Sequence, residues 1–295
     1  MADDALGTAA DITRRINAER VLILAWLRAI LLQLAHPLIA AGVAEHSTFR
    51  GNTQGALFRL HQTIGAMLAI SFGTADQRQT AIDGIRAIHR RVHGRLPHAC
   101  GRFAAGTNYS AEDPELLLWV HATLIESTLL AYEQLVAPLT DAERDRYCIE
   151  SADVAVALGA AVDAVPRSWN AMRALVTRGY TSGDIVVGHQ ARTLASSLVT
   201  PFEGRIGRSV VTPILSLLAA GQLPAAIRSQ YGFAWGPGRE RAFLRTIALF
   251  RVGRRTLPRQ IAWWKAARVE QADVQLIREH QRLHRTGRGR EHQPR

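Results

Sequence analysis

Cysteine and lysine are scarce in this 295-residue chain, which has two cysteines and a single lysine. The two cysteines, Cys100 and Cys148, exclude a disulfide-stabilised scaffold and any four-cysteine zinc or iron–sulfur site. Aromatic residues make up only 6% and charged residues 21% of the chain, whereas hydrophobic residues make up 47%. This balance excludes a wholly disordered chain, a collagen-like fibre and a coiled coil.

The positive charge is carried almost entirely by arginine, and the formal net charge is +11. Arginines are concentrated after residue 239. Guanidinium groups stay charged and bind phosphate or carboxylate, so such a region indicates contact with an anionic membrane or nucleic acid. No nucleic-acid fold signature accompanies the charge, so we expect no nucleic-acid partner. Peripheral membrane contact and a merely solvated arginine-rich surface both stay open.

The amino terminus begins acidic and polar, where an export signal needs a basic start followed by an apolar run. The most apolar stretch, residues 21–44, is long enough to span a bilayer. Arg28, Gln33, His36 and Pro37 interrupt it, and polar groups are costly in lipid. We therefore expect a buried core helix in a cytoplasmic protein, with membrane association as the alternative.

Apolar spacing, caps and glycine or proline stops divide the chain into helices. Helices are expected over 21–35, 56–73, 74–94, 114–136, 141–160, 165–180, 185–200 and 208–220, then short helices from 223 and a closing helix from 259. Residues 44–55 and 95–113 should be loops, and "DIVVGHQ" is the one short β-like run.

We predict an all-α protein with one domain of about ten helices. Residues 1–18 should be a leader, residues 19–270 the domain, and residues 271–295 a basic helix end with a disordered tail.

Histidines are concentrated in the first 121 residues, and His36, His89 and His121 fall within apolar helices. A buried neutral histidine needs hydrogen-bond partners. Three of them on separate apolar helices favour a site enclosed in the interior of a helical bundle. Three histidines that are merely satisfied within the core are the alternative.

The usual metal-binding motifs are missing, since the chain has no HExxH, no CxxC and no paired Glu-x-x-His. His89 and His93 are four residues apart, so both could bind one metal ion from the same helix face. A haem needs less: one axial histidine, an apolar pocket and a distal polar group. Spacing alone does not separate a haem pocket from an empty core.

Four blocks of the chain together resemble the MpaB-type oxygenase family, whose catalytic domain is shared with the bacterial latex clearing protein, a rubber oxygenase. The blocks are residues 28–50, 59–73, 85–94 and 113–147, in the expected order. The resemblance implies a globin-like bundle that holds one haem b. It also implies a haem-dependent oxygenase that acts with dioxygen on an apolar small molecule, such as an unsaturated or prenylated one.

The resemblance also implies which histidine holds the haem iron. The segment "IHRRVH" places His89 at the position of the family's axial ligand. His121 is its chief competitor and otherwise lines the pocket. His36 and His46 are weaker candidates, for a contact with a haem propionate or for a helix junction.

Arg59 and Thr63 have the four-residue spacing of the distal arginine and threonine of rubber oxygenases. Arg59 would stabilise an anionic oxygen species or a substrate carboxylate, and Thr63 would donate a hydrogen bond to dioxygen. A surface arginine and a threonine bonded within its own helix are the alternatives. Gln62 replaces a lysine that can cap the iron in some rubber oxygenases, so we expect no lysine-capped resting state. Rubber oxygenases are also exported, and we expect no export signal here, so polyisoprene is not the expected substrate.

Two other functions compete with the oxygenase. One is a non-catalytic helical module that binds haem or lipid and docks on anionic membranes through the arginine-rich third of the chain. The other is an enzyme that uses the same pocket without haem. Fold alone does not decide among them.

Overall fold

The computed structural model describes residues 12–46, 53–199 and 212–268, with side chains from residue 62 onward in the second range. The described chain is mostly helical, as predicted. Its elements are α2 (Ile12–Asn17), η1 (Arg20–Leu22), α3 (Ile23–Leu34), α4 (Pro37–His46), α5 (Thr53–Phe72), α6 (Ala75–His89), β1 (His93–Arg95), β2 (Asn108–Ser110), α7 (Pro114–Leu135), α8 (Asp141–Leu158), α9 (Trp169–Thr181), α10 (His189–Val199), α11 (Thr212–Gln222), α12 (Ala225–Gln230), α13 (Pro237–Thr256) and α14 (Arg259–Ala262).

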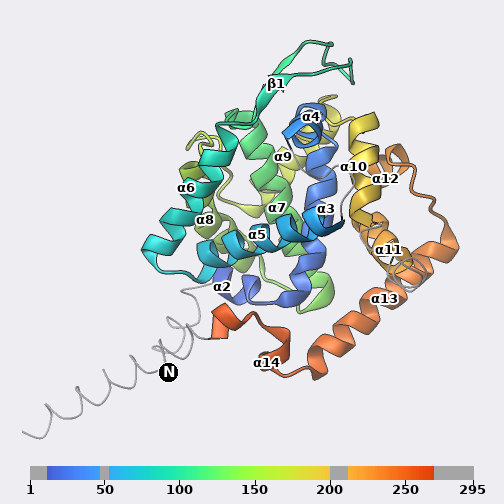
Figure 1. Ribbon diagram of the computed structural model, residues 1–295. Helices are drawn as coiled ribbons and strands as arrows, with labels where there is room; N and C mark the ends of the chain where they lie inside the picture. The colour runs from blue at the N-terminus through green and yellow to red at the C-terminus, as the bar shows by residue number, and fades with distance from the viewer. Residues whose placement is uncertain (1–11, 47–52, 200–211, 269–295) are drawn as a thin grey trace, which may run out of the picture.

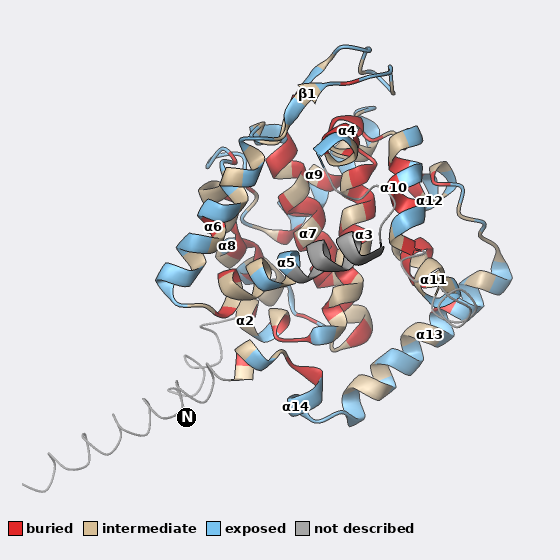
Figure 2. Cartoon of the chain, viewed as in Figure 1, coloured by how far each residue is buried: buried red, intermediate tan, exposed pale blue. Residues whose placement is uncertain are grey.

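Helix α7 is the central helix, and the other helices are arranged around it (Figure 1). Asp113 caps it by accepting a hydrogen bond from the amide of Glu115 at 2.9 Å, and Pro114 stands in its first turn. Helix α3 packs along it, and Trp119 Nε1 donates to the carbonyl of Leu32 at 3.2 Å. Buried residues are concentrated on α7, α3 and α4, whereas α13 is largely exposed (Figure 2).

The apolar 21–44 stretch forms two helices because Pro37 cannot continue the hydrogen bonding of α3. Helix α3 ends at Leu34, α4 begins at Pro37, and the helical axes over 20–34 and 37–46 differ in direction by 105°. Within the described ranges, no single helix is long and apolar enough to cross a membrane. Taken together, the two helices of this bent pair have the length and apolar composition of a membrane span. Leu31, Leu32 and Ala35 in this stretch are buried in the main core.

A short hairpin follows α6, where the sequence predicted a continuing helix and then a loop. Helix α6 ends at His89, and β1 pairs with β2 in antiparallel register, with Gly94 opposite Tyr109. A Cβ atom at Gly94 would lie 2.6 Å from the hydroxyl of Tyr109, so a larger residue there would displace the Tyr109 ring. Three-residue strands are too short for their alternation to be recognised. The expected β-like run is not a strand: Ile185 and Val187 are buried in an irregular segment.

Helix α2 lies within the predicted leader and packs into the core. Ile12 and Ile16 of α2 are buried, so the core begins inside the predicted leader; the rest of that leader, residues 1–11, and the predicted tail over 271–295 lie outside the described residues. The expected short helices after 223 are partly wrong, because α13 runs from Pro237 through 20 residues. Proline fits the first turn of a helix, so Pro237 starts this one.

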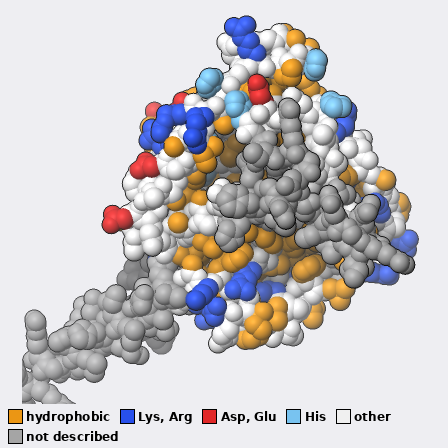
Figure 3. Space-filling view, viewed as in Figure 1, with side chains coloured by type: hydrophobic (Ala, Val, Ile, Leu, Met, Phe, Trp, Pro, Cys, Tyr) orange, Lys and Arg blue, Asp and Glu red, His pale blue; other side chains and the backbone are white. Residues whose placement is uncertain are grey.

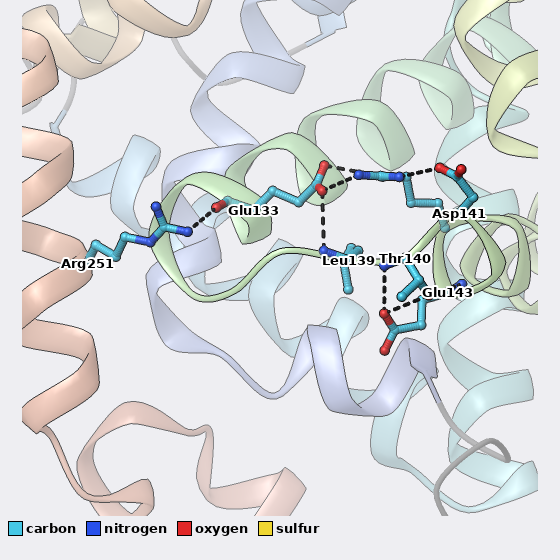
Figure 4. A network of polar contacts seen from close by, with 7 residues as sticks. Glu133, Leu139, Thr140, Asp141, Glu143 and Arg251 are labelled. Atoms are coloured by element: carbon cyan, nitrogen blue, oxygen red, sulfur yellow. Dashed lines mark hydrogen bonds and ion pairs between the residues drawn. The ribbon is translucent and has the colours of Figure 1, made fainter.

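Polar contacts join the end of α7 to α8 and α13 (Figure 4). The Glu133 carboxylate accepts hydrogen bonds from Arg144 and from the amide of Leu139, and its carbonyl accepts one from Arg251 at 3.2 Å. Beside them, Thr140 and Glu143 form a reciprocal capping box that starts α8. These contacts fix the turn between two helices that line the cavity described next.

Candidate functional site

A cavity of about 600 Å³ lies between α7, α8, α5, α2 and the start of α3. Much of its lining is apolar, with side chains from α3, α5 and α7: Ile23, Trp26, Met67, Leu68, Ile70, Leu124 and Ile125. Hydrophobic side chains also gather across the middle of the face in Figure 3, and Lys and Arg side chains lie toward its edges. A partly open cavity of this size, with apolar side chains along one side, is suited to a cofactor or to a small substrate with an apolar part.

His121 lines this cavity from the second turn of α7. The residue is 8% exposed, and its Nε2 is buried without a hydrogen-bond partner. Burial lowers the pKa of His121 to about 4, so its imidazole is neutral near pH 7. A neutral imidazole with an unpartnered nitrogen is suited to bind a metal or a polar ligand atom.

His89 is the last residue of α6 and is half-buried. Its Nδ1 is buried without a hydrogen-bond partner, and burial lowers its pKa, an effect that Glu112 partly opposes. The described residues that line the cavity include His121 but not His89. The structure therefore does not bring the two histidines together in that space, and the axial role of His89 stays a prediction.

His36 lies at the junction of α3 and α4. Its Nδ1 accepts a hydrogen bond from the amide of Leu38 at 3.3 Å, and its ring packs on Phe103 with centroids 5.3 Å apart. Burial lowers the pKa of His36 to about 4. His36 thus contacts groups at the helix junction, and a contact with a haem propionate stays a prediction.

His46 is exposed at the end of α4, next to the hairpin. Its Nε2 lies 3.1 Å from the carbonyl oxygen of His93 and 3.3 Å from the hydroxyl of Tyr109, which also donates to Glu45. Neither His46 nor His36 is among the described residues of the cavity lining.

The predicted distal residues belong to α5. The side chain of Arg59 lies outside the described residues, and Thr63 is exposed. Gln62 lines an open groove between α5 and α6, beside Ile85 and Ile88. Helix α5 reaches the main cavity through later turns, which the sequence analysis did not single out, because Met67 and Ile70 carry no distinctive chemical signal.

One side of the cavity is polar, and several of its groups are paired with one another. Glu150 accepts hydrogen bonds from the amide and hydroxyl of Thr13 at 3.0 and 2.8 Å and pairs with Arg146 at 2.8 Å. The hydroxyl of Tyr147 donates to Asn17 at 2.9 Å. Sequence reasoning missed these residues because their pairing joins α2 to α8 across more than a hundred positions.

In the part of the chain that the structure describes, no three or more His, Cys, Asp or Glu side chains gather in a way that could hold a metal ion. A structural or catalytic metal held by side chains alone needs about three such ligands. A haem iron needs only one axial histidine, because the porphyrin supplies the other ligands.

Residues 13–252 match the family of the ER-bound oxygenase mpaB/B' and the rubber oxygenase, over its catalytic domain. The chain belongs to this family. An uncharacterized protein of Mycobacterium tuberculosis and one of Mycobacterium bovis are similar, each 26% identical over 241 residues, which cover 79% of this chain and 89% of theirs. No solved structure matches the chain.

The mpaB/rubber oxygenase match extends from α2 into α13 and includes every described helix that lines the cavity. The resemblance predicted from the four sequence blocks is therefore confirmed. Family membership indicates an oxygenase enzyme, and with it dioxygen and an oxidisable substrate.

Proposed function

We propose that the chain is a haem-b-dependent oxygenase that oxidises an apolar small molecule, and that its helices form a globin-like bundle around the haem. The proposal rests mainly on His121, which lines the cavity and whose Nε2 is buried without a hydrogen-bond partner. Burying a polar atom without a hydrogen bond is costly, so such an atom indicates a missing ligand.

The residues present fit a haem. Two histidines, His89 and His121, each have a buried nitrogen without a partner, and burial keeps both rings neutral near pH 7. Neutral imidazole is the form that binds iron. The family resemblance supports His89 as the axial ligand, with His121 as the competing candidate. Haem b, when bound, supplies the redox chemistry with dioxygen.

The protein's own contribution is to bind the substrate and exclude water. Trp26, Met67 and Leu124 offer an apolar surface that would hold an unsaturated or prenylated chain. We propose that Arg59 and Thr63 provide the hydrogen-bond donors for oxygen, a role that rests on their spacing and the family resemblance.

The test is an absorption spectrum of protein expressed with a haem precursor, together with a pyridine hemochromogen assay. We expect a Soret band and about one haem b per chain. His89→Ala and His121→Ala then assign the ligand, since only loss of the axial histidine should shift or abolish the band. His189→Ala is the matched control because His189 is exposed at the start of α10.

Circular dichroism of each variant separates loss of haem from loss of fold. A folded protein that contains no haem and takes up no added hemin would refute the haem proposal. If haem is bound but no oxygen is consumed with any apolar substrate, a non-catalytic binding module becomes the better description.

A further inference from the structure

Helix α13 is attached to the body of the protein by one side only. Phe243 is buried against Gly221 of α11, where an added Cβ would lie 2.3 Å from the phenylalanine ring. Arg254 pairs with the buried carboxylate of Glu19, and Arg251 donates to the carbonyl of Glu133. These contacts orient the helix and determine which side faces solvent.

The opposite side of α13 carries large apolar residues in solvent. Leu244, Leu249 and Val252 are 56%, 72% and 58% exposed. At 100° per residue, all three fall within one 140° sector of the helix, and that sector does not include Phe243. We call this sector the outer face of α13. Single exposed leucines are ordinary, but several on one helix sector mark an interaction surface.

Arginines share the outer face. Arg241, Arg245 and Arg255 are exposed and fall within the same sector. The one acidic residue of α13, Glu240, accepts a hydrogen bond from Trp235 Nε1 at 2.6 Å. The outer face therefore combines exposed hydrocarbon with uncompensated positive charge.

We propose that the outer face of α13 docks on an anionic lipid surface. Arginines alone would suit nucleic acid equally well, but a phosphate backbone has no apolar surface against which exposed leucine and valine could be buried. A lipid interface accepts both, because the apolar side chains enter the acyl boundary while the guanidinium groups remain at the phosphates.

The chain that follows α13 leads to the cavity lining. Leu257 and Ile261, 42% and 54% exposed, follow α13 in the chain, and Trp264 three residues later lines the cavity. Tryptophan is favoured at lipid–water boundaries. Docking would therefore bring lipid close to the space where an apolar substrate binds; this last step alone rests on the proposed function.

The experiment is sedimentation of the full chain with vesicles of phosphatidylcholine, with and without phosphatidylserine. We expect binding to the anionic vesicles that weakens as salt is added. Arg241→Gln with Arg245→Gln should weaken it about fivefold per arginine. Leu249→Ser with Val252→Ser should weaken it about tenfold. Because these four side chains are exposed, circular dichroism should show an unchanged fold.

Matched controls come from other surfaces. Val162 is 54% exposed, and Arg173 and Arg178 are exposed on α9. Val162→Ser and the Arg173→Gln/Arg178→Gln pair should bind vesicles like the unaltered protein. Equal binding to neutral and anionic vesicles, or variants that match these controls, would overturn the proposal.

Two further measurements identify other occupants. A concentration-dependent dimer that Leu249→Ser/Val252→Ser abolishes would assign the outer face to a second copy of the chain. Binding to single-stranded RNA that depends on the arginines but not on the apolar pair would assign it to nucleic acid. Either result would overturn the proposal that the outer face docks on lipid. None of these measurements depends on bound haem, so the docking proposal can fail while the oxygenase proposal stands, and the reverse.

Discussion

An ion pair inside the helical core offers a direct test of how burial determines the energetics of this fold. Arg28 of α3 lies 2.7 Å from the carboxylate of Glu126 on α7, and the two side chains are 5% and 11% exposed. Arg28 also donates to the hydroxyl of Ser127 at 2.6 Å and to the carbonyl of Gln222 at 2.9 Å. Arg28→Met removes all three contacts and leaves a buried carboxylate without its counter-charge. We expect a loss of about 3–5 kcal/mol in the free energy of unfolding.

The matched control is Arg15→Met. Arg15 pairs with Glu143 at 2.6 Å, but its side chain is 44% exposed, so the expected loss is about 0–1 kcal/mol. Urea unfolding, monitored by circular dichroism, measures the free energy of unfolding of both variants. The double change Arg28→Met/Glu126→Leu should recover much of the loss, because it removes both buried charges. Similar losses for Arg28→Met and Arg15→Met, or no recovery in the double variant, would refute the argument.

Two other predictions concern titration and close packing. Burial lowers the pKa of both His36 and His121 from 6.5 to about 4. Between those values the unfolded chain binds protons that the folded chain does not, so the stability present above pH 6.5 is lost as the pH falls toward 4. The loss in the free energy of unfolding should reach roughly 3 kcal/mol per histidine. Between pH 6.5 and pH 4, the urea concentration at the midpoint of unfolding should therefore fall less for His121→Leu than for the unaltered protein. Gly221→Ala should lower the free energy of unfolding by about 1–3 kcal/mol, because the added methyl group would push against Phe243. Gly253→Ala is the control: no atom lies within contact distance of its added methyl group, so it should be neutral or stabilising. Thermal unfolding of both variants measures the difference.

Helix starts were predictable because their signals are local. Thr74, Asp113 and Thr140 each accept a hydrogen bond from an amide two or three residues ahead, so a few neighbouring letters contain the whole interaction. Helix ends were less predictable. The expected end of α6 at Gly94 was wrong by five residues, because pairing of β1 with β2 competes for that segment. Strand β2 follows β1 only after an intervening loop, so no pattern of neighbouring residues indicates that the two strands pair.

The candidate site was only partly predictable. The sequence singled out His121 as a buried histidine on an apolar helix, and the structure places it in the cavity. It could not indicate that Met67 and Trp26 share that cavity, since ordinary apolar residues have no chemical signature. Glu150 is a similar case: its partner Thr13 is 137 positions away, and only packing brings the two together.

By itself, the sequence determined the helical class, the break at Pro37, the family and the concentration of arginine near the carboxyl end. These follow from composition, from capping and from short motifs, all of which act over a few residues. Only the tertiary structure decided which side of α13 faces solvent and which histidine lines the cavity. The pairing of Arg28 with Glu126, 98 positions apart, also belongs to the tertiary structure. The physical reason is that burial and long-range pairing depend on how helices pack, and each packing contact joins residues whose spacing in the chain carries no signal.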